Sequence, residues 1–199
     1  MLSDHISFLT EFIRRPQNTG AVAPSSRWLA ETIVSDLGLE SASLVVEYGP
    51  GTGAFTGEIL TRLDADVDFI AIENNERMRR RVRERFPDID VADSSIEDLP
   101  SILEKRGHAP GDVDAIVSGL PWAAFGESLQ DRLLEITASV LAPEGRFATF
   151  AYIHGLLLSA GRRFREKLNE HFAEVDRSPI VWRNLPPAFV YRCRGRNEL

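Results

Sequence analysis

The sequence predicts an α/β fold in which a doubly wound, seven-stranded sheet is parallel except for a C-terminal antiparallel strand. One observation is the alternation of short apolar runs with segments of helical spacing along most of the chain. A second is a glycine-rich turn at residues 49–53, directly after the apolar run Leu44–Val46. The third is a closing pair of strands, about Glu174–Trp182 and Ala188–Arg194, joined by a proline-containing turn.

Length and composition narrow the possible classes of protein. The 199 residues are expected to form a single domain with a sizeable core, residues 41–199, behind an N-terminal helical cap, residues 1–40. The net charge of −7 argues against a dedicated nucleic-acid binder, so no nucleic-acid partner is expected. A single cysteine excludes an intrachain disulfide and a cysteine-based zinc site, which fits a reducing cytoplasm. We find no signal peptide and no run long enough to span a bilayer.

Two helices are expected before the glycine-rich turn. The first, Leu2–Arg15, carries an apolar stripe, and it either docks on the domain or lies among lipid headgroups as an interfacial helix. A loop of small residues, Gln17–Ser26, follows it. Ser25 or Ser26 then caps the second helix, which Gly38 ends.

The glycine-rich turn reads E-Y-G-P-G-T-G from Glu47 to Gly53 and leads into a helix. A strand, a glycine turn and a helix are typical of a nucleotide-binding βαβ unit, because glycine lets the backbone turn sharply and approach a ligand. Glu47 would repel a pyrophosphate at close range, whereas it would attract a cationic ligand. S-adenosylmethionine carries an ammonium and a sulfonium, and the pattern resembles motif I of the class I S-adenosylmethionine-dependent methyltransferases. A glycine turn in some other α/β protein is the alternative.

Acidic residues follow the next two expected strands. Glu73 ends the strand Asp68–Ile72, where a carboxylate can accept two hydrogen bonds from a ribose diol. A solvated acid at a strand end is the alternative. Asp93, with Ser94 beside it, matches the place where class I methyltransferases bind the adenine amino group. Ser94 or Ser95 can also cap a helix.

The helix between these acids, Asn75–Phe86, carries six arginines. They spread around the helix, so no single basic stripe is predicted. We interpret them mainly as a solvated face, with a lipid- or phosphate-facing role as the alternative.

The fourth expected strand, Val113–Val117, leads into the loop Ser118–Trp122, which reads S-G-L-P-W. In amino-methylating enzymes of this class, a short loop with a proline and an aromatic residue follows this strand and often begins with Asn or Asp. Its polar groups accept hydrogen bonds from the target nitrogen, while the aromatic residue stacks on the substrate or faces its growing positive charge. Ser118 replaces the usual Asn or Asp, which weakens the case for a planar nucleobase amine. A packing role for Trp122 is the alternative.

Several segments together resemble the small bacterial phospholipid N-methyltransferases, Rossmann-like enzymes that methylate phosphatidylethanolamine at the membrane surface. The segments are TGAVAPSS, VVEYGPGTG, SGLPW and VWRNLPPAFVY. The resemblance covers nearly the whole chain and makes residues 41–199 the catalytic core. It implies S-adenosylmethionine as methyl donor, S-adenosylhomocysteine as product, and no metal. It also implies a cytoplasmic protein at the inner face of the membrane, with the N-terminal amphipathic helix contacting phospholipid headgroups.

The resemblance assigns roles to residues that follow four of the strands. The expected cofactor contacts are Glu47, Gly49, Gly51 and Gly53 for the methionine part, Glu73 for the ribose, Asp93 with Ser94 for the adenine, and Tyr48, Asn74, Ser118 and Leu120 as further contacts. The expected substrate contacts are Gly119, Leu120, Pro121 and Trp122. Trp122 stands where many members are expected to carry a smaller apolar residue, which leaves the headgroup preference open.

The expected reaction is an in-line displacement in which a neutral amine attacks the sulfonium methyl group. Because an ethanolamine amine is mostly protonated at neutral pH, a proton must leave before the attack. Ser118, Tyr152 and His154 are the candidate catalytic residues, and the last two lie at the end of the fifth expected strand, Phe147–Tyr152. Packing or surface roles are the alternatives for Tyr152 and His154, and catalysis can instead rest mainly on positioning.

Other functions remain open at this point. Enzymes that methylate adenine N6 in ribosomal RNA resemble this chain in the glycine turn and the early loop, although its negative net charge counts against an RNA substrate. A small-molecule or protein amine is a second alternative acceptor. A lipid-binding protein that has lost catalysis is a third alternative. A dehydrogenase is the last, since Ala54 completes the dinucleotide pattern of glycines.

Overall fold

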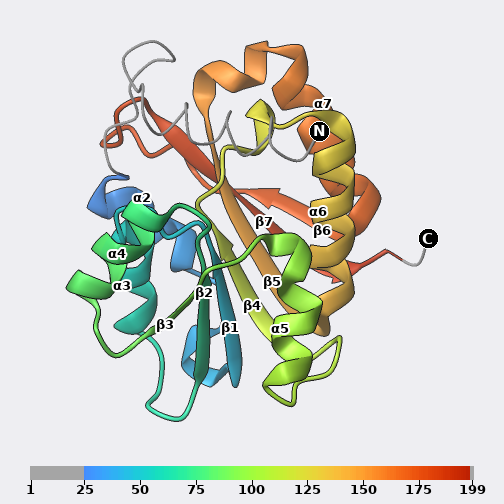
Figure 1. Ribbon diagram of the computed structural model, residues 1–199. Helices are drawn as coiled ribbons and strands as arrows, with labels where there is room; N and C mark the ends of the chain where they lie inside the picture. The colour runs from blue at the N-terminus through green and yellow to red at the C-terminus, as the bar shows by residue number, and fades with distance from the viewer. Residues whose placement is uncertain (1–24, 198–199) are drawn as a thin grey trace.

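Seven strands form one sheet in the computed structural model of the protein, which describes residues 25–197 (Figure 1). The strand order is β3-β2-β1-β4-β5-β7-β6. The expected helix Leu2–Arg15 and most of the loop Gln17–Ser26 lie outside the described residues. A single domain over residues 1–199 therefore stays a prediction.

The expected fold class is confirmed, because β7 runs antiparallel to both of its neighbours while the pairs from β3 to β5 are parallel. The strands are β1 (Leu44–Tyr48), β2 (Asp68–Ile72), β3 (Asp90–Ala92), β4 (Val113–Ser118), β5 (Leu141–Tyr152), β6 (Phe172–Arg177) and β7 (Ala188–Arg196). The α-helices are α2 (Arg27–Val34), α3 (Ala54–Leu60), α4 (Glu76–Arg85), α5 (Leu99–Lys105), α6 (Glu127–Val140) and α7 (Ser159–His171). Short 3-10 helices are η1 (Leu39–Ser41), η2 (Ile96–Asp98), η3 (Trp122–Ala124) and η4 (Ile153–Leu157).

Helices cover both faces of the sheet, which explains why β1 is apolar and buried along nearly its whole length. Its side chains alternate between two cores. Val46 and Tyr48 pack with residues of α5, α6 and α7, whereas Val45 packs with residues of α2, α3 and α4. Figure 1 shows these two groups of helices on opposite sides of the sheet. None of the helices within residues 25–197 is long and apolar enough to cross a membrane.

Polar side chains fix the starts of several helices. Ser26 caps α2 by accepting a hydrogen bond from the Leu29 amide at 3.2 Å. Asn75 caps α4 in the same way. At η2 the capping residue is Ser95, with Asp98 completing a capping box. The sequence left two serines open as the cap at each of two places, Ser25 or Ser26 and Ser94 or Ser95. In both places the second serine is the cap.

The fifth strand begins earlier than the sequence predicts, at Leu141 instead of Phe147. Its pairing with β4 passes from Val113 opposite Leu141 to Ala115 opposite Arg146, so the extra residues form a bulge. The turn that was expected before Phe147 is therefore part of β5.

The sixth strand ends earlier than predicted, at Arg177 instead of Trp182. Pro179 has no amide hydrogen to donate to the ladder, which explains the early end. An isolated bridge between Val181 and Ala188 closes the connection to β7.

Trp122 lies in the core, between the sheet and α7. Its side chain is 2% exposed and stacks on Phe164 with ring centroids 5.5 Å apart. Phe147 and Phe125 meet the indole edge-on, at 5.8 and 6.0 Å. The indole nitrogen donates to Ser118 Oγ over 2.9 Å. The loop after β4 is therefore anchored by its own aromatic residue.

Trp122→Ala should lower the free energy of unfolding by about 3–5 kcal/mol, because it empties a large space in the core. The matched control is Trp182→Ala, whose side chain is 69% exposed. That change should stay within about 0.5 kcal/mol. Denaturant unfolding of both variants measures the difference. Equal effects of the two substitutions would contradict the packing described for Trp122.

Candidate active site

The carboxyl ends of four neighbouring strands lie in one row. Tyr48 of β1 is paired with Ile72 of β2 and with Ser118 of β4, and Ile72 is paired with Ala92 of β3. The segments that follow this row emerge at one edge of the sheet, where open α/β sheets bind ligands. These segments hold the glycine turn, Glu73 and Asn74, Asp93 and Ser94, and the loop Ser118–Trp122.

The glycine turn adopts backbone angles that suit glycine. Gly49, Gly51 and Gly53 have φ angles of 64°, 56° and 76°, a region that other residues rarely adopt. Among the described residues, a Cβ atom on Gly51 would meet the Gly49 carbonyl oxygen at 3.8 Å and nothing nearer. The backbone at Gly51 therefore borders open space that a ligand can fill.

Glu47 is fully buried beneath this turn. Its Oε2 atom accepts a hydrogen bond from Thr56 Oγ1 of α3 over 2.7 Å, whereas Oε1 has no partner among the described residues. Burial raises the pKa of Glu47 to about 8, the Thr56 hydrogen bond lowers it, and the charge of Glu73 raises it further. A buried carboxylate oxygen without a partner is costly, and a donor on a ligand would satisfy it.

Glu73 is held by two backbone amides. Its Oε2 atom accepts a hydrogen bond from Gly51 at 3.2 Å, and its Oε1 atom accepts one from Asn75 at 2.9 Å. Burial raises the pKa of this carboxyl, and both amides and Arg79 oppose the rise. The carboxylate thereby ties the glycine turn to the start of α4. Asn74, next to Glu73, is exposed.

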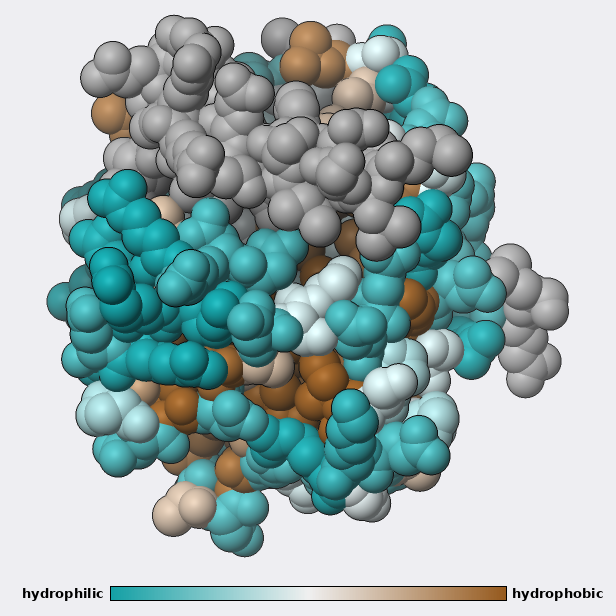
Figure 2. Space-filling model, in the orientation of Figure 1, coloured by the Kyte–Doolittle hydropathy of each residue, from teal (hydrophilic) through white to brown (hydrophobic). Residues whose placement is uncertain are grey.

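Arg79 is a residue of this edge that the sequence analysis missed. It is 7% exposed, and it donates to the Glu73 carbonyl oxygen at 2.9 Å and to Asp93 Oδ2 at 2.7 Å. The other five arginines of α4 are exposed and give this side of the molecule a hydrophilic surface (Figure 2). Arg79 lies one turn from the buried Val82, and that spacing was the available signal.

Asp93 and Ser94 are polar residues that directly follow the carboxyl end of β3. The Asp93 side chain is paired with Arg79 but remains 68% exposed. Ser94 Oγ donates to Asp98 Oδ2 over 2.7 Å, so this hydroxyl supports the start of η2.

The loop after β4 contacts the glycine turn backbone to backbone. The Gly119 amide donates to the Tyr48 carbonyl oxygen over 2.8 Å. A Cβ atom on Gly119 would lie 2.6 Å from the Gly49 carbonyl oxygen, so no larger residue fits without moving the backbone. Leu120 packs on Gly49 from the same loop, and the half-buried Pro121 follows it.

Three predicted site side chains point away from open space. The Ser118 hydroxyl is buried and accepts hydrogen bonds from the Trp122 indole and, at 3.3 Å, from the Leu120 amide. The Tyr48 phenol is buried against Thr137 of α6, at 3.4 Å. The expectation that the Trp122 ring faces a substrate is corrected here, because the ring is enclosed by other aromatic side chains. It has the packing role that was the alternative.

Tyr152 and His154 lie at the end of β5, on the same edge. Their rings stack with centroids 5.6 Å apart and planes 7° from parallel. Burial raises the pKa of Tyr152 to about 12, so its phenol stays protonated at neutral pH. His154 is exposed. Earlier in β5, Thr149 donates to the Ser118 carbonyl oxygen over 3.3 Å, which joins this strand end to the loop after β4.

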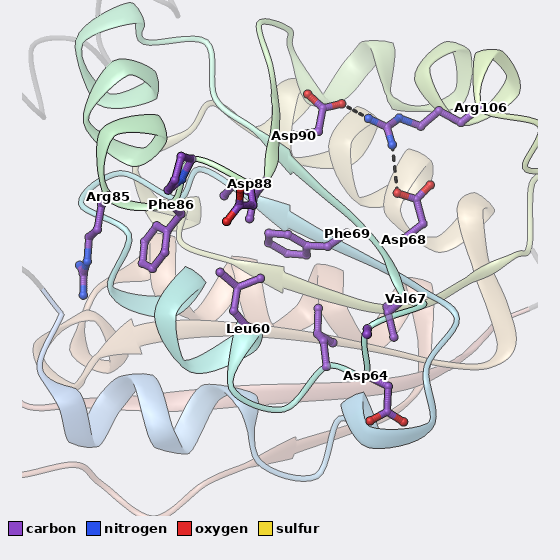
Figure 3. A pocket seen from close by; sticks show the side chains of 14 residues that line it. Leu60, Asp64, Val67, Asp68, Phe69, Arg85, Phe86, Asp88, Asp90 and Arg106 are labelled. Carbon is purple, nitrogen blue, oxygen red and sulfur yellow. Dashed lines mark hydrogen bonds and ion pairs between the residues drawn. The ribbon is translucent and has the colours of Figure 1, made fainter.

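A separate cavity of about 620 Å³ lies at the opposite end of β2. Apolar side chains from α3, β2 and the end of α4 line it, and Arg106 bridges Asp68 and Asp90 beside it (Figure 3). Asp68 begins β2, whereas Glu73 follows its carboxyl end, so this cavity is not part of the edge described above. Nowhere in residues 25–197 do three or more His, Cys, Asp or Glu side chains gather as metal ligands would.

Comparisons with known proteins show the family of this chain. Residues 45–145 match the methyltransferase domain family. The chain belongs to this family. Over 99% of both chains, the methyltransferase is 36% identical to the ornithine lipid N-methyltransferase of Singulisphaera acidiphila.

Two solved structures share the fold at low sequence identity. One is an S-adenosylmethionine-dependent methyltransferase from Aquifex aeolicus, with a TM-score of 0.64, 16% identity, and coverage of 89% of this chain and 97% of that one. The other is an O-methyltransferase from Bacillus cereus in complex with S-adenosylhomocysteine, with a TM-score of 0.66, 14% identity, and coverage of 94% and 90%.

The protein is thus a class I S-adenosylmethionine-dependent methyltransferase, as the resemblance implied. Its residues fit this methyl donor. The Oε1 atom of Glu47, which has no partner within residues 25–197, suits a cationic group, and the open space at Gly51 suits a ligand that approaches the backbone closely. The expected identity of the donor and the expected enzyme class are both confirmed.

The pKa of Glu47 predicts a pH dependence of stability. Because the folded protein holds a proton up to about pH 8 that the unfolded chain releases near pH 4.5, the free energy of unfolding should fall between these values. Glu47→Gln should remove this fall and stabilise the ligand-free protein at pH 8.5 by roughly 3–5 kcal/mol. Denaturant unfolding at pH 5 and 8.5 tests this. Glu104→Gln, an exposed acid in α5, is the control and should show no such pH-dependent gain.

Proposed function

We propose that the methyltransferase transfers its methyl group to the amine of a membrane lipid headgroup. The observation that carries this proposal is the 36% identity, over 99% of both chains, with a protein named for N-methylation of ornithine lipid. Phosphatidylethanolamine, the acceptor that the sequence analysis favours, also presents an aliphatic amine. Ornithine lipid and phosphatidylethanolamine are therefore the two acceptors to compare.

The loop after β4 supports an aliphatic amine over adenine. A planar exocyclic amine is best held by an Asn or Asp side chain, whose oxygen accepts its hydrogen bond. Ser118 takes that place, but its hydroxyl oxygen is buried and already accepts two hydrogen bonds inside the loop. The carbonyl oxygens of Ser118, Leu120, Pro121 and Trp122 each accept a hydrogen bond as well. Among the described residues the Gly119 carbonyl oxygen has no partner, so it remains as an acceptor for an amine that can rotate freely.

In this proposal the acids beside the glycine turn bind the methyl donor. Glu47 Oε1 would accept a hydrogen bond from the ammonium of the methionine part, and Glu73 would accept the ribose hydroxyls on lone pairs that its two amide contacts leave free. When bound, S-adenosylmethionine supplies an electrophilic methyl group on a positively charged sulfur. Asp93, which Arg79 positions, would bind the adenine.

In this proposal Tyr152 orients the acceptor amine and His154 takes its proton. A phenol that keeps its proton at neutral pH cannot serve as the base, but its oxygen can accept a hydrogen bond from the ammonium and orient it. The imidazole of His154 stacks on Tyr152 and reaches solvent, so it can carry the proton away before the attack. Positioning of the neutral amine then supplies most of the rate acceleration.

Transfer of labelled methyl groups to ornithine lipid and to phosphatidylethanolamine in vesicles tests the acceptor. We expect a labelled lipid with at least one of them. Glu47→Gln should weaken S-adenosylhomocysteine binding by about tenfold or more, since a charged hydrogen bond is lost. Calorimetry measures that binding separately. If the protein binds S-adenosylhomocysteine but labels neither lipid, the lipid acceptor is wrong, and RNA adenine and small amines are tested next.

Tyr152→Phe should lower kcat by about tenfold, because one hydrogen bond to the amine is lost in the transition state. Binding of S-adenosylhomocysteine should not change. Tyr191→Phe, a buried tyrosine of β7, is the matched control and should keep full activity. A wild-type kcat in Tyr152→Phe, or an equal fall in both variants, would contradict the role given to Tyr152.

A further inference from the structure

The large apolar side chains that are exposed within residues 25–197 gather at one end of the molecule. They come from the start of α2, the residue before α7, and the connection between β6 and β7. We call this set the apolar rim. Its members are Trp28, Leu158, Ile180, Trp182 and Leu185. Trp182 and Leu185 are the most exposed, at 69% and 77%.

Three contacts join the start of α2, the β6–β7 connection and η4, which leads to Leu158. The Ser26 amide, before α2, donates to Asn184 Oδ1 at 2.9 Å, and the guanidinium of Arg183 lies 5.0 Å from the Trp28 ring centroid. The Ile153 amide of η4 donates to the Pro187 carbonyl oxygen at 3.1 Å. In Figure 1 the β6–β7 connection (red) and η4 (orange) lie at the same upper end. The apolar rim is thus one surface.

The apolar rim borders the acceptor end of the active site. Ala188, the first residue of β7, is paired with Tyr152, the last residue of β5. The connection that precedes Ala188 therefore lies at the edge where Tyr152 and His154 emerge. Any surface that binds the apolar rim comes close to these two side chains.

The β6–β7 connection is a turn that its own hydrogen bonds fix, and its apolar side chains are exposed. Asn184 is 3% exposed, its amide donates to the Val181 carbonyl at 3.2 Å, and its side chain donates to the Pro186 carbonyl at 2.7 Å. Exposed turns normally carry polar residues, so exposed Trp182 and Leu185 on a well-fixed turn need a reason.

The composition of this connection suits a lipid surface. Residues 178–187 contain one charged residue, Arg183, and no acid, although the chain as a whole carries a net charge of −7. Tryptophan and arginine are typical of the headgroup region of membranes, where a ring can be half buried and a cation can meet phosphate. The absence of acids from this connection avoids repulsion from an anionic leaflet.

We propose that the apolar rim docks on a lipid bilayer, with Trp182 and Leu185 entering the headgroup layer. The inference rests on the proposed lipid acceptor and extends it, because it names the surface that brings the bilayer to the acceptor end of the site. A headgroup amine can then reach Tyr152 without the lipid leaving the membrane.

The double variant Trp182→Ser/Leu185→Ser tests the docking. Both side chains are largely exposed, so the fold should be kept, and thermal unfolding checks this. The control is Leu63→Ser, which removes an apolar side chain beside the cavity at the opposite end of β2. Flotation with phosphatidylcholine vesicles, with and without phosphatidylglycerol, measures binding. The double variant should bind at least about tenfold more weakly than the wild type, and the control should bind equally well.

Rates of methyl transfer distinguish a loss of membrane docking from a loss of catalysis. With the lipid acceptor in vesicles, the double variant should be about tenfold slower than the wild type. With a short-chain, monomeric form of the same acceptor, the two rates should be equal. If the double variant binds vesicles as the wild type does, the docking proposal is overturned, whichever lipid is methylated. If no lipid is methylated but vesicle binding is lost, docking stands and the proposed acceptor fails.

Tryptophan fluorescence gives an independent readout. In a Trp28→Phe background, Trp122 is a buried reference and Trp182 is the reporter. Vesicles with brominated acyl chains should quench the Trp182 emission, and an unquenched signal in bound protein would overturn the proposal. A dimer that dissociates in the double variant, with vesicle binding intact, would show that the apolar rim joins copies of the chain and would likewise overturn it.

Discussion

The backbone contact between the glycine turn and the loop after β4 is the constraint on which the rest of the site depends. The Gly119 amide donates to the Tyr48 carbonyl over 2.8 Å, and Gly119 lies too close to Gly49 for any side chain. The loop can approach this closely because its far end is held in the core, where the Trp122 indole donates to Ser118. A displacement reaction needs its donor and acceptor at a fixed distance, and two backbones in contact provide that distance with little conformational freedom.

The parts of the fold that are encoded locally could be predicted from the sequence. The apolar runs at β1, β2 and β4 and the glycine turn are local signals, and from them Glu47, Glu73 and Asp93 could be placed at one edge of the sheet, where the structure has them. Arg79 and Thr56 were missed because their roles depend on neighbours from other elements. Nothing local separates Arg79 from five other arginines of α4 except its spacing from Val82, and nothing in the sequence pairs Thr56 with Glu47.

The placement of Trp122 shows why residue type alone was insufficient. An aromatic residue after the fourth strand was interpreted as a substrate contact, yet its ring fills a space bounded by Phe164 of α7 and Phe147 of β5. That space exists because α7 packs on this face of the sheet, and no pattern within the loop reports it. Boundaries of β5 and β6 were misplaced for a related reason, since a bulge and an early strand end depend on the partner strand as well as on local sequence.

The charges at the edge explain a preference for a cationic ligand over a dinucleotide. Arg79 donates hydrogen bonds to the Glu73 carbonyl oxygen and to the Asp93 carboxylate. The Glu47 carboxyl, in contrast, accepts a hydrogen bond only from the Thr56 hydroxyl among its described neighbours. Burial therefore keeps much of Glu47 protonated at neutral pH, so the ligand-free site avoids an uncompensated buried charge. An ammonium at Oε1 would favour the carboxylate, and the two charges would then offset each other's desolvation. A pyrophosphate in the same place would not stabilise the ionised form of Glu47. The buried carboxyl beneath the glycine turn therefore discriminates between S-adenosylmethionine and a dinucleotide, whose binding sites have similar glycine patterns.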